Sequence, residues 1–424
     1  MPRPQSIDIL HLTMLDSENT RILESDVCEA FESLSESCRR RSSTPDYDDR
    51  KPKISTKQIN VLKSLLIKMR TTLLPSLRQR MADLLVFLDA SHFPKDPQAN
   101  LRATLEITSQ LADILVQIRA AVRALTLARL RAFEYRDDFH GIAKIHRTEP
   151  FLEKVDDLIN FSLCAVFERH VEFVQGWNCP SEEKRAARFD ERSVSEETTI
   201  TFELIDELIR LLTKSDFGNM QDTWQLTVTR QYDIGLANLI EHIIIQSDQA
   251  RNPAKTDLSD IHTPTIKIGP VQTARSRELT LLRSALPFVK LGRLFFSKLL
   301  VTPISRPPFT IKDIISSVEL GNLKNKTYLF SDQMSNFTER LVGLSDFNRF
   351  HNNLSSLKNH FEETMKYFNG SIELLNRHLV PLSTDKLALP RSTTVFNYHS
   401  SLLIDQFRLA AQNFSITLER FRNE

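Results

Sequence analysis

Apolar side chains recur every three or four residues along most of this chain, and that spacing is typical of amphipathic helices. One long stripe shows the pattern: Leu101, Leu105, Leu111, Leu115, Ile118, Val122 and Leu125. Comparable stripes predict helices near 17–40, 55–88, 97–125, 150–170, 198–214, 219–247, 271–301, 310–342, 345–380 and 391–422. We therefore predict an all-α fold in which long antiparallel helices form two consecutive helical bundles.

Residues that begin or interrupt helices refine these ranges. Ser55 and Asp96 are expected N-caps, and Asp96 is followed by Pro97 at the first helical position. Pro75 should kink or restart its helix, because proline lacks a backbone N–H and its ring clashes with the preceding turn. The Thr-Glu-Pro run at 148–150 is expected to open another helix in the way that Asp96-Pro97 does.

Large apolar residues at helical intervals mark the expected core. Phe407, Phe414 and Phe421 are spaced by seven residues and predict one buried seam of the last helix. Leu115 and Leu294 are also expected in the core, where truncation to alanine costs about 2–5 kcal/mol.

The length of 424 residues exceeds the roughly 250–300 at which a single core stops growing. The polar stretch at 250–270 contains three prolines and is the strongest candidate linker. We predict an N-terminal helix and charged linker at 1–53, a first helical bundle at 54–249, the linker at 250–270, and a second bundle at 271–424.

Glycine is scarce, with 9 residues in the chain against a usual share of about 7%. Phosphate loops and nucleophile elbows need glycine where the backbone turns sharply. Neither GxxxxGK[ST], GxGxxG nor GxSxG occurs in the sequence, so it offers no P-loop, dinucleotide fingerprint or hydrolase elbow. No cofactor is expected.

The charges balance, with 55 basic and 54 acidic residues, so no global field favours nucleic acid or an anionic membrane. Nucleic acid is therefore not an expected partner unless a local patch exists. The sequence predicts no secretory signal and no membrane span. The four cysteines lack CxxC spacing, which favours a reduced compartment, and we expect a cytoplasmic or nuclear location.

The polar residues suggest two alternatives to a non-enzymatic scaffold, a metal site and an enzyme. Asp137, Asp138, His140 and His146 are residue types that bind zinc, but their spacing matches no known site, and a solvated loop explains them better. No metal-binding and no catalytic residue is assigned. An enzyme with a polar pocket between helices remains the rival hypothesis, with Asp137, Asp138, His140 and His170 as the first residues to inspect.

The most specific short motif lies at 39–45, where three arginines precede Ser42, Ser43 and Thr44-Pro45. These three residues are candidate phosphorylation sites, because the arginines suit a basophilic kinase and the proline a proline-directed one. Phosphate there would make a positive segment neutral or negative. An ordinary charged linker is the simpler interpretation.

Three short sequence segments are similar to those of a known family: 73–80 (LLPSLRQR), 294–300 (LFFSKLL) and 410–414 (AAQNF). They resemble an expanded set of uncharacterised rust-fungus proteins over most of residues 55–424. More remotely, the layout is similar to helical bundles of the cyclin-D-binding protein group. The first resemblance implies a soluble fungal protein of unknown role, and neither supplies site residues.

The sequence therefore favours a non-enzymatic intracellular scaffold or adaptor that binds protein partners through its long helices. The alternatives are the enzyme described above and a fungal protein that acts in a host after export without a signal peptide.

Overall fold

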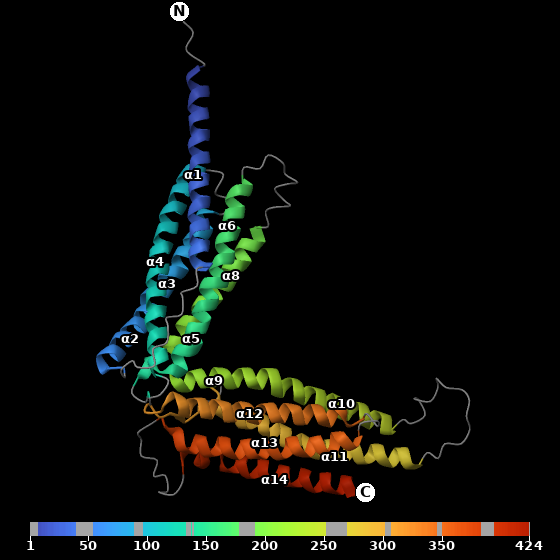
Figure 1. Cartoon of the computed structure of the whole chain (residues 1–424). Helices are drawn as coiled ribbons and strands as arrows, with labels where there is room; N and C mark the ends of the chain where they lie inside the picture. Colours follow the sequence, from blue (N-terminus) through green and yellow to red (C-terminus); the bar gives the residue numbers. More distant parts are fainter. Residues whose placement is uncertain are drawn as a thin grey trace, which may run out of the picture. The chain divides into compact units, whose positions relative to one another are not determined.

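The computed structural model describes residues 7–39, 54–88, 96–132, 137, 140–177, 191–251, 269–301, 307–345, 350–382 and 394–423. Helices account for nearly all of them, which confirms the all-α class. The chain divides into two compact units, Met1–Lys214 and Ser215–Glu424 (Figure 1). We call them unit 1 and unit 2.

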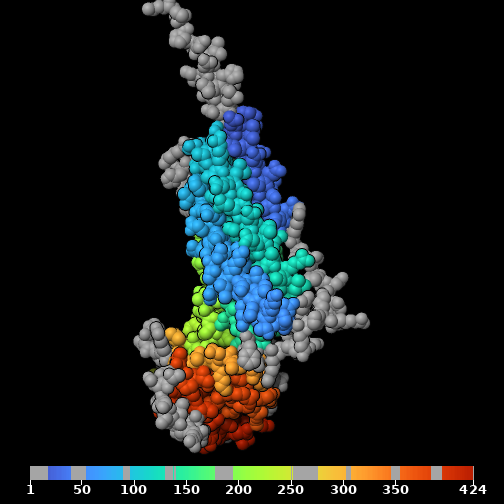
Figure 2. Space-filling view, turned by 90° about the vertical axis from the view of Figure 1, so that its left-hand side faces the viewer, coloured from blue at the N-terminus to red at the C-terminus, as the bar shows by residue number. Residues whose placement is uncertain are grey.

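Unit 1 is built from long helices that run along one another. Its α-helices are α1 (Ile7–Arg39), α2 (Thr56–Lys68), α3 (Leu74–Phe87), α4 (Pro97–Ala132), α5 (Ile145–Asp157), α6 (Cys164–Trp177) and α8 (Glu191–Thr213). Helix α1 packs against both α4 and α6, and the blue and teal ribbons of α1 and α4 lie side by side (Figure 1, Figure 2). Helix α1 is therefore part of this bundle, and the separate N-terminal segment predicted at 1–53 is wrong for its helical part.

Two π-helical turns join consecutive helices of unit 1. Turn η1 (Met69–Leu73) links α2 to α3, and η4 (Leu158–Leu163) links α5 to α6. Pro75 lies in the first turn of α3. The expected interruption at Pro75 is thus present as a local π-turn, because the missing proline N–H is accommodated just before a new α-helix begins.

The predicted N-caps are confirmed at two helices. The Ser55 hydroxyl accepts a hydrogen bond from the Gln58 backbone N–H at 3.3 Å, and the Gln58 side chain accepts one from the Ser55 N–H at 2.8 Å. Asp96 Oδ1 accepts from the Ala99 N–H at 3.1 Å. The predicted opening at 148–150 is wrong, since α5 begins at Ile145 and contains Pro150.

Unit 2 contains a second set of helices and a small sheet. Its elements are α9 (Asp216–Thr227), the π-turn η5 (Val228–Tyr232), α10 (Asp233–Arg251), α11 (Gly269–Leu299), β1 (Phe309–Ile311), α12 (Ser317–Val342), the 3-10 turn η7 (Gly343–Ser345), α13 (Phe350–His378), β2 (Leu379–Pro381) and α14 (Val395–Asn423). The tightest helix pairs are α12 with α13 and α11 with α14, while α10 packs on α11 and α12.

Strands β1 and β2 pair antiparallel, with Phe309 opposite Pro381 and Ile311 opposite Leu379. A helix was predicted from 310, but α12 begins only at Ser317, because Ser316 caps it. The Ser316 hydroxyl accepts from the Glu319 N–H at 3.2 Å, and the Glu319 carboxylate accepts from the Ser316 N–H at 3.0 Å. This capping box fixes the start of the helix.

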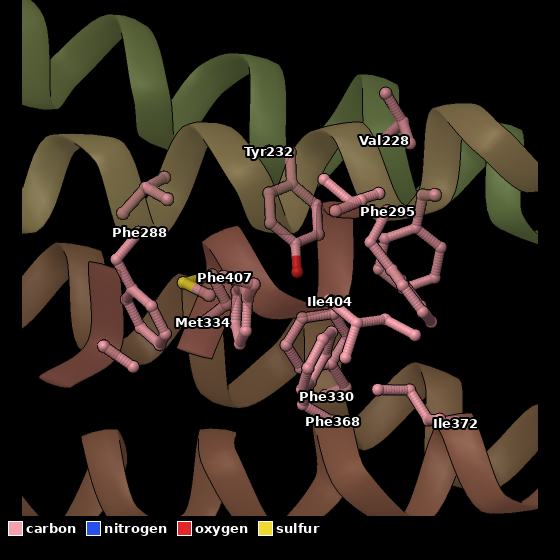
Figure 3. Close-up of a cluster of buried hydrophobic side chains, with 14 of the residues drawn as sticks. Val228, Tyr232, Phe288, Phe295, Phe330, Met334, Phe368, Ile372, Ile404 and Phe407 are labelled. Atoms are coloured by element: carbon pink, nitrogen blue, oxygen red, sulfur yellow. The ribbon is translucent and has the colours of Figure 1, made fainter. Parts of the chain in front are cut away.

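A cluster of phenylalanine rings fills the core of unit 2 (Figure 3). The ring centroid of Phe407 lies 3.9 Å from that of Phe368 and 4.7 Å from that of Phe288. Phe414 is fully buried as well, and Phe421 packs against the same core. The seam predicted from the spacing of seven is therefore confirmed.

The structure places the division between the units at Lys214 and Ser215, and not within 250–270. Helices α9 and α10 belong to unit 2 because their apolar residues pack on α11 and α12. The π-turn η5 between them makes the same contact, since the ring centroid of its Tyr232 lies 5.5 Å from that of Phe296 on α11. The proline-containing stretch at 250–270 thus connects two helices of the same unit. The signal missed in the sequence is Ser215, whose hydroxyl caps α9 by accepting from the Gly218 N–H at 3.1 Å.

Candidate functional site

The candidate phosphorylation sites Ser42, Ser43 and Thr44 lie outside the described residues. Their modification therefore stays a prediction from the sequence.

Asp137 has a structural role at the start of α5. Its side chain is buried, and its Oδ2 accepts a hydrogen bond from the Ile145 N–H at 2.8 Å. Its backbone carbonyl accepts from the His140 N–H at 2.9 Å. Asp138 lies outside the described residues. Across the part of the chain that the structure describes, no group of three or more His, Cys, Asp and Glu side chains is placed to hold a metal ion.

His170 lies elsewhere in unit 1, at the interface of α1 and α6. Its ring stacks on Phe31 with centroids 5.1 Å apart, and its Nδ1 lies 2.7 Å from the Val166 carbonyl oxygen. That contact places the proton on Nδ1. Within the part of the chain that the structure describes, the buried Nε2 has no hydrogen-bond partner. Burial lowers the pKa of His170 to about 4, so the ring is neutral near pH 7. The structure does not bring His170 together with Asp137.

An apolar groove opens between α2 and α4. It has a volume of about 220 Å³ and is lined by Val61, Leu62, Ala124 and Leu127 together with Ile54, Gln58 and Ala128. Ile54 directly follows and Ala128 directly precedes residues whose side chains are not described.

Among the described residues of unit 2, a row of exposed apolar side chains lies on one face of α14. Tyr398, Leu402, Leu409 and Ile416 are 48%, 70%, 56% and 45% exposed. Steps of four and seven residues return to the same side of a helix, so these four side chains form one line. The line lies opposite the seam of Phe407 and Phe414. We call these four residues the α14 stripe.

Exposed basic residues occur on α14 itself and on the adjacent α11. Exposed Arg408 and Arg420 lie on α14, and exposed Lys290 and Lys298 lie on α11. Helices α11 and α14 are neighbours, as the 5.9 Å separation of the Phe295 and Phe396 rings shows.

Acidic residues are few on the same two helices. Glu278 is the single acid in the sequence of α11, and Asp405 and Glu419 are those of α14. Two of the three have partners within unit 2: Glu278 lies 3.7 Å from His242 and Glu419 lies 3.0 Å from Lys358. Asp405 is therefore the acid that shares the exposed face with the stripe, and the surface of α11 and α14 is locally basic in a chain with a formal net charge of +1.

The α14 stripe was not predicted from the sequence. Leu402, Leu409 and Ile416 repeat at the same interval of seven as the phenylalanines of the buried seam. The sequence signal for this surface is the presence of two apolar series of equal period on one helix. A helix that packs on one side needs only one such series, so the second can lie exposed.

Two domain families of unknown function cover most of the chain. Residues 62–213 match the family described as Domain of unknown function (DUF8723), and residues 215–416 match the family described as Domain of unknown function (DUF8721). The two matches meet at the boundary between unit 1 and unit 2. The chain is thus similar to uncharacterised domains, one in each unit. The sequence has no match among curated proteins.

Among the described residues, no helix combines the length and the apolar character needed to cross a bilayer.

Proposed function

We propose that this protein is a non-enzymatic helical adaptor, and that the α14 stripe docks an amphipathic helix of a partner protein. The observation that carries the proposal is the alignment of four exposed apolar side chains along one face of α14. Single exposed apolar residues are ordinary on protein surfaces. Four in one line at helical intervals are the pattern by which a helix recognises another helix.

The charges on α14 and α11 define the chemistry of the partner. Exposed Arg408 and Arg420 on α14 and exposed Lys290 and Lys298 on α11 make the surface of these two helices positive. An amphipathic helix with an apolar line of its own and acidic residues beside it matches both features. Complementary charges would set orientation and association rate, and burial of the apolar line would supply most of the affinity.

The width of the stripe favours a protein helix over a membrane or a nucleic acid. A helix that lies in a bilayer interface presents a broad apolar face, whereas the α14 stripe is one side chain wide and has Gln406 and Asn413 beside it. Nucleic-acid binding depends chiefly on phosphate contacts, and a central line of leucines contributes none.

The test compares two triple variants of the full chain. In the stripe variant, Leu402→Gln, Leu409→Gln and Ile416→Gln remove the line. In the control variant, Ile314→Gln, Val318→Gln and Leu382→Gln remove three apolar side chains that are 63%, 69% and 62% exposed at the ends of β1, α12 and β2. All six are surface positions, so each substitution should change stability by no more than about 0.5 kcal/mol, and both variants should stay folded.

Each protein is used to capture partners from native lysate, and captured proteins are cross-linked with a reagent that joins amines to carboxylates. We expect a protein that wild type and the control variant retain and the stripe variant loses. We also expect cross-links from Lys290 or Lys298 to Asp or Glu of a helical segment in that protein. Equal capture by all three chains contradicts the proposal.

Two further measurements test whether a second copy of the chain or a membrane, and not a partner helix, binds the α14 stripe. Sedimentation velocity reports whether the chain self-associates, and a wild-type dimer that the stripe variant abolishes would assign the surface to a second copy. Cosedimentation with phosphatidylserine vesicles that depends on the stripe would assign it to a membrane. Either result overturns the partner-helix proposal.

A cytoplasmic location and a fungal source form part of the same proposal. They are supported by the cysteine pattern and by the resemblance to rust-fungus proteins. Immunofluorescence of the tagged chain in a fungal cell tests the location.

A further inference from the structure

Two buried cysteines face each other across the interface of α1 and α6. Cys38 lies in the last turn of α1 and Cys164 is the first residue of α6. Both side chains are buried, and the thiols are close enough for each to shift the pKa of the other. The Cys164 thiol also lies 3.6 Å from the carbonyl oxygens of Ser35 and Ile159. The two residues are distant in sequence, so only the fold brings them together.

Glu168 closes this part of the interface from the α6 side. Its Oε1 accepts a hydrogen bond from the Ser35 hydroxyl at 3.0 Å and forms an ion pair with Arg39. Ser35 and Arg39 flank Cys38 on α1, and Glu168 is one helical turn beyond Cys164 on α6. The carboxylate therefore holds the end of α1 over the two thiols.

We propose that Cys38 and Cys164 are a modification site at which a low-molecular-weight disulfide, such as oxidised glutathione, forms a reversible disulfide bond between α1 and α6. One cysteine thiolate attacks a sulfur of the reagent, which gives a mixed disulfide and releases one thiol. The second cysteine thiolate attacks the protein sulfur of the mixed disulfide and releases the second thiol. The protein loses two electrons and two protons, and the reagent is reduced to two thiols.

The position of Cys38 gives the reagent a route to the pair. Helix ends fray more readily than helix interiors, and Cys38 is the penultimate residue of α1. In the closed state burial protects the thiols, because it raises the pKa of Cys38 to about 12 and also raises that of Cys164. The positive charge of Arg119 lowers the pKa of Cys38 in part, and that of Arg39 lowers the pKa of Cys164. The negative charge of Glu168 raises the pKa of Cys164 further. Oxidation should therefore follow opening of the last turn of α1.

A bond between residues 38 and 164 would close a long loop of the chain. Closing a long loop restricts the unfolded chain, so the oxidised protein should be more stable than the reduced one. The bond would also hold α1 against α6 when the rest of the interface opens.

The test begins with reduced full-length protein incubated with oxidised glutathione at pH 8. Non-reducing peptide mapping should show a linked pair of peptides that contain Cys38 and Cys164, and dithiothreitol should reverse it. The thermal midpoint should rise on oxidation of the wild type. Glu168→Gln weakens the closure of α1 and should speed the reaction severalfold, whereas Glu172→Gln, on the same helix and paired with Arg169 at 2.7 Å, is the matched control.

Cys38→Ala and Cys164→Ala should each abolish the linked peptide and the rise in midpoint, and Cys28→Ala should preserve both. The proposal is overturned if wild-type peptides pair through Cys28 or Cys179 instead. It is also overturned if Cys38 and Cys164 remain reduced while denatured protein oxidises under the same conditions. The wild-type map decides the question even where an alanine variant fails to fold.

Discussion

The indole Nε1 of Trp224 donates a hydrogen bond to Oγ1 of Thr327 across 3.0 Å, which ties α9 to α12 within unit 2. Both side chains are fully buried. The Thr327 hydroxyl in turn donates to the Leu323 carbonyl at 2.9 Å. Because a buried donor without an acceptor is costly, this threonine is what allows a tryptophan at that position of the core.

Thr327→Val removes the acceptor while it keeps the shape of the side chain. We expect a loss of about 1–3 kcal/mol in the free energy of unfolding, since the indole N–H is left unpaired. Thr338→Val is the matched control, because Thr338 is also buried on α12 and donates only to a helix carbonyl, that of Met334 at 2.8 Å. Urea titration of the three proteins measures the difference, and equal losses in both variants would disprove the role of the indole contact.

Gly292 lies where α11 approaches two buried side chains closely. A Cβ there would stand 3.0 Å from Met334 Cε and 3.2 Å from Tyr232 Cε1. Gly292→Ala should therefore destabilise the protein by about 1–3 kcal/mol, because the neighbours must move. Gly321→Ala on α12 meets nothing within 4 Å and should stabilise by about 0.5–1 kcal/mol through helix propensity. Thermal melts that shift in the same direction for both variants would contradict this expectation.

His170 should make stability depend on pH. Its pKa falls from an ordinary 6.5 to about 4 in the folded protein, so between these values the unfolded chain binds more protons. The contribution that neutral His170 makes to the free energy of unfolding is therefore fully present above pH 6.5. It is lost as the pH falls toward 4, by on the order of 3 kcal/mol.

His170→Phe keeps an aromatic ring against Phe31 and should remove that part of the slope. Some slope will remain, because desolvation also lowers the pKa of His378. The measurement is the free energy of unfolding of both proteins at several pH values from 7.5 to 4. Parallel curves would show that His170 does not titrate as described.

Leu115 and Leu294 give a paired test of the core. Leu115 is 1% exposed on α4, and Leu115→Ala should cost about 2–5 kcal/mol. Leu294 is 44% exposed on α11, so its predicted place in the core is wrong, and Leu294→Ala should change stability by no more than about 0.5 kcal/mol. Comparable losses in chemical denaturation would place Leu294 in the core after all.

Helical periodicity in the sequence was sufficient to predict the class of fold and most of its helices. Ser55, Asp96 and the Phe407 seam could be assigned because a cap or a spacing of seven depends on local residues. The unit boundary could not, because it depends on which helices Trp224 and Tyr232 contact. The prediction that Leu294 is buried was wrong for a related reason. Phe295 and Phe296 beside it occupy the buried face, and periodicity alone does not show which of three adjacent apolar residues is exposed.

The candidate sites were less accessible to sequence reasoning. Asp137 and His170 are residue types that serve many roles, and only the fold shows that one caps α5 and the other packs on Phe31. The pairing of Cys38 with Cys164 depends on the register of α1 against α6, which no local pattern encodes. The α14 stripe was visible as a repeat, but its exposure depends on which neighbours α14 has.

The pairing of β1 with β2 has a consequence for how unit 2 could change. Helices α12 and α13 lie between these strands in the chain, and the antiparallel register brings the two ends of that segment to one point. The segment that contains α12 and α13 therefore begins and ends at the same strand pair. A hairpin exchanged between residues 309 and 381 would keep its two ends in place through the strand pair, but it would also have to replace the core side chains that α12 and α13 supply, such as Phe330, Met334 and Phe368.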